Sequence, residues 1–322
     1  MSVSTAVVLA AGEGTRLRPL THNRPKPMLP AANRPILEYV FDALAETVDH
    51  IVVVVGYKRD RVQGQFGPSY RGVDLTYVHQ GKQLGSGHAL LQAREAVDDP
   101  MLVLNGDRVI DTHIVEDVVD AFEAEGDPTM AVLERPETSQ YGAVSLHGEE
   151  VVELVEKPDT DQYRLINAGV YAFPPSVFEA VAATDREAGE LALTETIVNL
   201  MADGRVRGVR TEGMWVDATY PWDLLAVSDE ILARGHVDER RQGEEVWVDP
   251  DATVHEAAVL QGPVVRTTVR VLDRGGDEEV AETRELPVDT HPDAARAFAA
   301  DLRERGAAEI IDRARRRVEG DV

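Results

Sequence analysis

Three short, entirely apolar runs constrain the fold of this chain more than any other feature. They occupy residues 7–11, 51–55 and 101–104, and a glycine follows each of them within two residues. A strand that is apolar on both faces is buried between two layers, which is typical of parallel sheets. Apolar residues at helical spacing lie between these runs, at 35–46, 58–65 and 85–96. This alternation predicts βαβ units and an α/β fold, in which helices flank a Rossmann-like mixed, mostly parallel sheet.

A further strand is predicted at 73–79, and from residue 129 the pattern changes to shorter strands. They follow one another with few helices between them, at 129–133, 142–146, 151–156 and 168–173. We expect these strands to extend the sheet and to form the second wall of a cleft. Helices at 174–182, 194–202 and 220–234, with a short strand at 214–217, complete a predicted first domain over residues 1–235.

The segment 244–322 is predicted to be a small C-terminal appendage. Within its residues 246–266, Val248, Val254 and Leu260 recur every six residues. This spacing resembles the hexapeptide repeat of a left-handed parallel β-helix, but stable solenoids need about three or more repeats and only one coil is present. A vestigial coil and an ordinary edge strand or two therefore both stay open. Helical spacing returns over 293–318.

The charge of the chain excludes some partners and suggests an environment. It has 58 acidic and 33 basic residues, a formal net charge of -25, and only four lysines. Such a field repels nucleic acid, so no nucleic-acid partner is expected. Abundant acidic residues with little lysine resemble the proteins of salt-in halophiles, in which salt screens the self-repulsion. The few lysines are therefore expected where an ammonium is needed.

Targeting signals and cysteine chemistry are not expected. We see no basic segment followed by an apolar one at the N-terminus, and no run of about 18 apolar residues that would span a membrane. The sequence has no cysteine, which excludes disulfides and thiolate catalysis. These features favour a cytoplasmic protein without a membrane partner. The oligomeric state stays open, with the appendage as a candidate interface of a homo-oligomer.

A glycine turn with two cations follows the first apolar run. Gly12 and Gly14 permit a sharp turn close to a ligand, and Arg16 and Lys26 follow, with Lys26 between two prolines that favour an extended, stiff loop. Such a loop predicts a polyphosphate site. The dinucleotide fingerprint fails because Leu17 stands where a third glycine is needed, and no Gly-Lys-Ser/Thr follows for a Walker A loop.

A longer pattern is far more specific than a bare G-x-G after a strand. It consists of the run G-x-G-T-R-L-x-P-L-T followed by P-K-P, with G-D at 106–107 and E-K-P at 156–158. Over residues 3–234 the chain resembles the sugar-1-phosphate nucleotidyltransferases. The resemblance implies the nucleotide-diphospho-sugar transferase fold. It also implies transfer of a nucleotidyl group from UTP or dTTP to glucose 1-phosphate or a related sugar 1-phosphate, with Mg²⁺ as cofactor and pyrophosphate as product.

The resemblance also assigns roles to residues of the nucleotide half. Arg16 would hold the triphosphate and Lys26 the α-phosphate, since guanidinium and ammonium groups match phosphate oxygens. Asp107 would bind the metal, with Asp217 as its second ligand. The base and the rest of the nucleotide would contact Leu9, Ala10, Ala11, Gly12, Gly14, Gln80 and Gly85.

In the sugar half, the resemblance implies that Glu156 binds sugar hydroxyls and Lys157 the sugar phosphate, with Gly142 and Asn167 completing the pocket. The chain departs from the family at Asp217-Ala218-Thr219, where relatives often have Asp-x-Gly. Two other functions stay open. One is a regulatory subunit that binds a nucleotide sugar without reacting, which the presence of Arg16, Lys26 and Asp107 disfavours. The other is a nicotinamide-dependent oxidoreductase, which Leu17 disfavours.

Overall fold

The computed structural model describes residues 2–234, except 137, 161, 187, 188 and 222. It also describes the backbone of residues 240–241, 247–248, 264–272 and 279–287, and residues 300, 301, 304 and 305. The chain divides into two compact units, Met1–His236 and Val237–Val322. None of the helices in the described part of the chain is long and apolar enough to cross a membrane.

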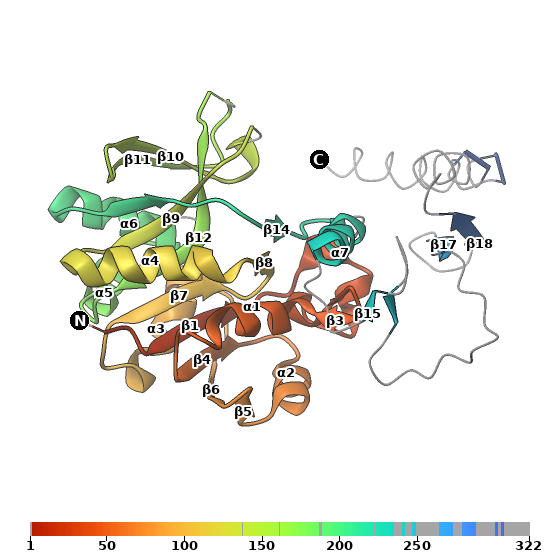
Figure 1. The fold of residues 1–322 in the computed structure, drawn as a ribbon, viewed down its shortest axis with the longest axis horizontal. Coiled ribbons are helices and arrows are strands. Elements are labelled where there is room, and N and C mark those ends of the chain that lie inside the picture. Colours follow the sequence, from red (N-terminus) through yellow and green to blue (C-terminus); the bar gives the residue numbers. More distant parts are fainter. Residues whose placement is uncertain are drawn as a thin grey trace. The chain divides into compact units, whose positions relative to one another are not determined.

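The first unit is built on one large sheet. Its strands are β1 (Thr5–Ala10), β4 (His50–Val55), β5 (Ser69–Tyr70), β6 (Val73–His79), β7 (Met101–Asn105), β9 (Thr129–Glu134), β10 (Gly142–His147), β11 (Glu150–Glu156), β12 (Leu165–Phe173) and β13 (Arg207–Arg210). In the described residues they lie in the order β10-β11-β13-β9-β12-β7-β1-β4-β6-β5 (Figure 1). The predicted strands are therefore present, with bounds shifted by a few residues at most.

The sheet is mixed, as predicted, but it is not mostly parallel. Among the described strands, parallel pairing is confined to the group β7-β1-β4-β6 and to the pair β9–β13. β12 runs antiparallel to both of its neighbours, β7 and β9, and the β10–β11 hairpin is antiparallel too. The prediction of a mostly parallel sheet was drawn from the three apolar runs, and it holds only for the part of the sheet that contains them.

Helices cover both faces of the sheet. Side chains alternate along a strand, so Val8, Val53 and Leu104 face one core while Val7, Val52 and Val103 face the other. The first core packs against α1 (Ile36–Leu44), α2 (Arg59–Phe66) and α4 (Thr112–Glu125), and the second against α3 (Ser86–Leu91), α5 (Val177–Ala183) and α6 (Leu193–Asp203). The α4 helix was not predicted, although its buried residues Ile114, Val118 and Phe122 have helical spacing.

The glycine turn leads into three single-turn 3₁₀ helices rather than the extended loop that its prolines predicted. They are η1 (Thr15–Leu17), η2 (Leu20–His22) and η3 (Lys26–Met28). Pro25 is extended, as expected, but Pro27 lies inside η3, where its fixed φ suits a helical turn.

Two small ribbons complete the first unit, and α7 (Asp223–Arg234) is its last helix. One ribbon pairs β2 (Pro30–Ala31) with β3 (Arg34–Pro35), and the other pairs β8 (Arg108–Ile110) with β14 (Trp215–Asp217).

The second unit contains two described strand pairs, each antiparallel. β15 (Arg240–Arg241) pairs with β16 (Trp247–Val248), and β17 (Val264–Leu272) pairs with β18 (Glu279–Pro287). The β17–β18 hairpin was not predicted, because its charged residues gave no apolar run. The hexapeptide-like segment 246–266 and the predicted helix 293–318 lie almost entirely outside the described residues.

The strand order creates a crevice at one edge of the sheet. From β1 the chain adds β4 and then β6 on one side, and it returns to add β7 on the other side of β1. In open α/β sheets, ligands bind at the carboxyl ends of the strands where the order reverses in this way. Here Leu9 of β1 lies opposite Asn105 of β7 at that edge. The fold therefore places the glycine turn and the Asn105–Gly106–Asp107 turn next to each other.

A core substitution tests the central position of β7. Leu102 lies on this strand between β1 and β12 and is fully buried. We expect Leu102→Ala to lower the free energy of unfolding by about 2–5 kcal/mol, because it leaves a cavity. Val152→Ala, at a side chain on β11 that is 51% exposed, is the control and should change it by less than about 0.5 kcal/mol. Urea unfolding at fixed salt measures both, and equal losses would contradict the packing described.

Candidate active site

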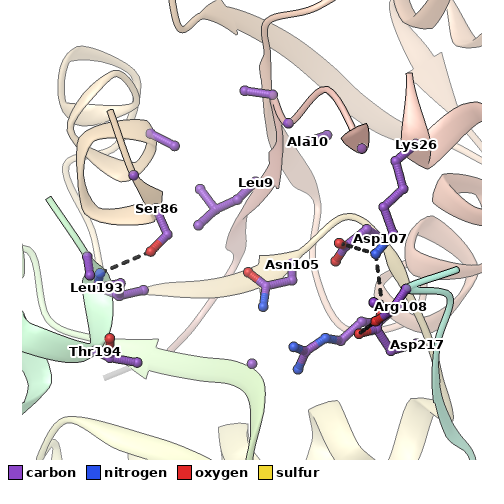
Figure 2. A pocket seen from close by; sticks show the side chains of 18 of the residues that line it. Leu9, Ala10, Lys26, Ser86, Asn105, Asp107, Arg108, Leu193, Thr194 and Asp217 are labelled. Atoms are coloured by element: carbon purple, nitrogen blue, oxygen red, sulfur yellow. Dashed lines mark hydrogen bonds and ion pairs between the residues drawn. The ribbon is translucent and has the colours of Figure 1, made fainter. Parts of the chain in front are cut away.

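A cavity of about 760 Å³ lies at the carboxyl edge of the sheet (Figure 2). Its walls come from the glycine turn, from the ends of β1, β7 and β11, and from the start of α6. Every site residue predicted from the sequence lines it: Leu9, Ala10, Ala11, Gly12, Gly14, Arg16, Lys26, Gln80, Gly85, Asp107, Gly142, Glu156, Lys157, Asn167 and Asp217. The structure thus brings the predicted set together, while the role of each residue stays a prediction.

Gly14 positions Lys26 at the cavity. It has a φ of 64°, a left-handed conformation that favours glycine. A Cβ atom at this position would lie 2.7 Å from Cβ of Lys26, so only glycine lets the two segments pack this closely. The Thr21 hydroxyl donates a hydrogen bond to the Gly14 carbonyl at 3.0 Å, and the buried Leu17 anchors the turn.

Lys26 lies between two carboxylates at one corner of the cavity. Its Nζ is 2.7 Å from Oδ2 of Asp107 and 2.9 Å from Oδ1 of Asp217. Figure 2 shows the three side chains meeting there. Lys26 and Asp217 are 13% and 10% exposed, whereas Asp107 is 34% exposed. The two carboxylates are therefore close enough to share a single cation.

Opposite charges at this corner favour the ionised forms of Lys26 and Asp107. Loss of hydration would by itself lower the pKa of Lys26, but Asp107 and Asp217 raise it above its ordinary value. Loss of hydration would likewise raise the pKa of Asp107, yet the Lys26 ammonium and the Arg108 guanidinium bring it below its ordinary value. Both members of the pair are thus charged at neutral pH.

The β8–β14 ribbon brings Asp217 to Asp107. Asp217 lies directly opposite Arg108, the residue that follows Asp107, although the two strands are about a hundred residues apart in sequence. Two contacts hold Arg108 in turn. Its Nη1 donates a hydrogen bond to the Ala168 carbonyl at 2.9 Å, and its guanidinium carbon lies 4.6 Å from the centre of the Trp215 ring. The antiparallel register therefore fixes the spacing of the two carboxylates.

These carboxylates have the chemistry of a magnesium site. Mg²⁺ prefers oxygen ligands and is usually held by one or two carboxylates together with phosphates and waters. Asp107 and Asp217 supply two such oxygens around the position that Nζ of Lys26 occupies. In the described part of the chain no cluster of three or more His, Cys, Asp or Glu could hold a metal by itself. The donor set fits Mg²⁺ carried with a phosphate ligand better than an all-protein metal cage.

Arg16 differs from Lys26 in having no carboxylate partner in the described part of the chain. Its side chain is exposed at the cavity wall on η1. The neighbouring Arg18 pairs with Glu13 at 3.1 Å and does not line the cavity. The guanidinium of Arg16 is therefore available to an anion.

Gln80 is buried where β6 ends, and hydrogen bonds hold its amide. Its Nε2 donates to the Gly85 carbonyl at 3.1 Å and lies 2.9 Å from Nδ1 of His88. Gln83, one turn further on, donates from Nε2 to the Ala11 carbonyl at 3.0 Å. This segment thus closes over the glycine turn from the β6 side.

The opposite wall is formed by the strands that extend the sheet. Glu156 and Lys157 form a half-exposed pair at 3.7 Å, and Gly142 lies opposite Glu156 in the β10–β11 register. Lys157 has a φ of 45°, which is uncommon for a residue other than glycine and costs free energy.

Asn167 on β12 is largely occupied within the protein. Its Oδ1 accepts from the Gly169 amide at 2.9 Å, and its Nδ2 donates to the Tyr171 hydroxyl at 2.8 Å. Burial raises the pKa of Tyr171 to about 12, so this hydroxyl stays protonated. One N–H of Asn167 remains for a ligand.

Several cavity residues were missed by the sequence analysis. Arg108 follows the predicted Asp107 and could have been found from the strand end that carries it. The stretch Glu190, Ala192, Leu193 and Thr194 gave no such signal. It is joined to the 84–87 segment by backbone hydrogen bonds, from Leu191 to the Leu84 carbonyl at 2.7 Å and from Gly87 to the Leu191 carbonyl at 2.8 Å.

Comparison with known proteins identifies the family of the chain. The family model named Nucleotidyl transferase matches residues 5–234. The chain therefore belongs to the nucleotidyl transferase family, a family of enzymes, which confirms the resemblance drawn from its motifs. Membership also rules against the oxidoreductase alternative.

Two relatives illustrate the breadth of this family. "Bifunctional protein GlmU" of Methanocaldococcus jannaschii is 35% identical over 257 residues, which cover 79% of this chain and 61% of that protein. The chain thus spans less than two thirds of that relative. "UTP--glucose-1-phosphate uridylyltransferase AglF" of Haloferax volcanii is 37% identical over 227 residues, which cover 68% of this chain and 92% of that protein.

Solved structures share the fold. A UDP-glucose pyrophosphorylase complexed with UDP-glucose superposes with a TM-score of 0.66 at 22% identity, over 72% of this chain and 99% of the other. A Bacillus anthracis protein described as a glucose-1-phosphate thymidylyltransferase has a TM-score of 0.67 at 24% identity, over 75% of this chain and 98% of the other. These likenesses confirm an α/β fold with a mixed sheet and flanking helices.

The bridging position of Lys26 can be tested without any substrate. Lys26→Met leaves two carboxylates close together with only the Arg108 guanidinium, among the described residues, as a nearby counter-charge. We expect this variant to lose about 1–3 kcal/mol of unfolding free energy in EDTA. This is less than the cost of breaking a fully buried ion pair, because solvent screens the partly exposed Asp107. Mg²⁺ should restore part of the loss. Lys82→Met, at an exposed lysine, is the matched control and should be neutral. A Lys26→Met protein as stable in EDTA as the parent would show that the bridge is misplaced.

A pair of glycines tests the packing around Arg108. Gly169 has a φ of 73°, and a Cβ there would lie 2.5 Å from Nδ2 of Asn105 and 3.0 Å from Nη1 of Arg108. Gly72 has a φ of 91° with open space around it. We expect Gly72→Ala to cost about 1–2 kcal/mol for its backbone alone, and Gly169→Ala to cost at least about 1 kcal/mol more because of the clash. Chemical unfolding compares the two, and similar losses would argue against a tight fit at Gly169.

Proposed function

We propose that this protein transfers a nucleotidyl group from UTP or dTTP to a sugar 1-phosphate, such as glucose 1-phosphate, and releases pyrophosphate. The observation that carries the proposal is that the Lys26 ammonium bridges the carboxylates of Asp107 and Asp217 in a cavity that Arg16, Glu156 and Lys157 also line. The names of the relatives support it, since they include a UTP--glucose-1-phosphate uridylyltransferase.

The reaction requires positioning and charge stabilisation rather than acid–base catalysis. An oxygen of the sugar phosphate attacks the α-phosphorus of the nucleotide in line. The bond from that phosphorus to the oxygen bridging to the β-phosphate breaks, and the electron pair leaves with pyrophosphate. Because the nucleophile is already an anion, no general base is needed. Cations aimed at the charge that builds up on the phosphates supply the catalysis.

Each residue then has a definite task. Arg16, which has no carboxylate partner in the described residues, holds the triphosphate and the leaving pyrophosphate. Lys26 stabilises the α-phosphate, and Asp107 and Asp217 hold Mg²⁺. When bound there, Mg²⁺ neutralises charge on the phosphate oxygens. The chain's own residues fix the distance between the reacting phosphates, which is worth several orders of magnitude in rate.

The remaining walls of the cavity bind the base and the sugar. The backbone of Leu9, Ala10, Ala11 and Gly12, together with Gln80 and Gly85, holds the nucleotide. Glu156 binds sugar hydroxyls and Lys157 binds the sugar phosphate, beside Gly142 and Asn167. The net charge of -25 supports work at high salt, where self-repulsion is screened.

Pyrophosphate release measures the proposed activity directly. The protein is incubated in molar KCl with Mg²⁺ and with each pairing of a nucleoside triphosphate and a sugar 1-phosphate. We expect release with UTP or dTTP and a hexose 1-phosphate, and little with either substrate alone. Nucleotide-sugar binding without release for any pairing would favour the regulatory subunit instead.

Two variants test the assignment of the charged residues. We expect Asp107→Asn and Arg16→Ala each to lower kcat/KM by at least about 10²–10³, since each removes a charge that the transition state uses. Asp74→Asn, at an exposed aspartate on β6 outside the cavity, should keep the parent rate. Both site variants should remain folded by circular dichroism. Near-normal turnover in either of them would mean that the site has been placed wrongly.

A further inference from the structure

The hydrogen bonds of Gln80 determine which way its amide faces. The Gly85 carbonyl can only accept, so the Gln80 atom 3.1 Å from it must be the amide nitrogen. The same nitrogen lies 2.9 Å from Nδ1 of His88. Gln80 donates one amide hydrogen to the Gly85 carbonyl, so its other amide hydrogen points to His88, whose Nδ1 must then accept it. The His88 ring is therefore neutral and carries its proton on Nε2.

Both amide hydrogens of Gln80 are thus used inside the protein. The carbonyl Oε1 is the part of the side chain left for a ligand in the cavity that Gln80 lines. An acceptor at this position discriminates between pyrimidines. Uracil and thymine carry a hydrogen on ring nitrogen N3 and can donate to Oε1, whereas N3 of cytosine is itself an acceptor. Two acceptors facing each other leave both unpaired, which costs binding free energy.

We propose that His88 is a specificity-determining residue, which fixes Gln80 as an acceptor and so selects uracil or thymine nucleotides over cytosine nucleotides. The inference rests on the nucleotide site proposed above. His88 does not line the cavity, so it acts through Gln80 as a positioning residue. The Gly85 contact alone restrains one amide hydrogen, and the His88 contact supplies the second restraint that stops the amide from rotating.

The surroundings of His88 keep its ring in the accepting form. Its pKa is lowered by burial and by the positive charge of Arg186, which lies in the connection between α5 and α6. The α3 helix that carries His88 is tied to that connection, since the backbone amides of Gly87 and His88 both donate to the Leu191 carbonyl. Protonation would turn Nδ1 into a donor facing the Gln80 NH₂ group. The accepting arrangement is therefore lost only below the ordinary pKa of histidine, near pH 6.5.

Binding of UTP and CTP, measured by calorimetry with Mg²⁺ and without sugar phosphate, tests the proposal independently of turnover. We expect His88→Leu to lower the ratio of UTP to CTP affinity at least about tenfold, chiefly by weakening UTP. His88→Asn, whose side-chain oxygen can accept in place of Nδ1, should keep the ratio within about threefold. If His88→Leu does not fold, His88→Ala removes the same acceptor.

A pH series separates positioning from a merely structural role. As the pH falls below 6.5, the parent protein should lose more UTP affinity than His88→Asn, and the titration of the nucleotide phosphates cancels in this comparison. Equal pH dependence, or an unchanged UTP to CTP ratio in His88→Leu, overturns the role of His88 and leaves the nucleotide site intact. If the parent binds neither nucleotide, the proposed nucleotide site itself fails, and the inference fails with it.

Discussion

The pairing of β1 with β4 on one side and with β7 on the other is the constraint on which the rest of the structure depends. Because the chain returns across β1 between β6 and β7, the carboxyl ends of β1 and β7 meet at one edge. The glycine turn leaves β1 there, and the turn that carries Asp107 leaves β7. Every other part of the site is attached to this edge, including the sheet extension that begins at β12 and the ribbon that carries Asp217.

The charges at this edge are divided between two places. At the Lys26 corner, two carboxylates are matched by the Lys26 ammonium and by the Arg108 guanidinium. Arg16, on the cavity wall, has no carboxylate partner in the described residues. A phosphate would give Arg16 a counter-charge, and under the proposed function a divalent cation would arrive with it for the carboxylates to hold.

The sequence predicted those parts of the fold and site that depend on local pattern. The apolar runs located β1, β4 and β7, and the motif residues all reached one cavity. What failed depends on long-range pairing. The antiparallel position of β12 between β7 and β9 has no local signature, and neither does the joining of Leu191 to the 84–87 segment. Arg108 follows Asp107 at a strand end, where a local signal exists, but its contacts with Asp217 and Trp215, more than a hundred residues away, do not show in the sequence.

The β8–β14 ribbon limits how this chain can vary in length. Successive side chains of a strand point to opposite faces, so one residue inserted into Arg108–Ile110 or Trp215–Asp217 would turn the Asp217 carboxylate away from Lys26. The connections elsewhere on the surface can accept insertions and deletions without this effect. Related proteins that keep this chemistry should therefore differ in the lengths of their loops, while the number of residues within the ribbon stays constant.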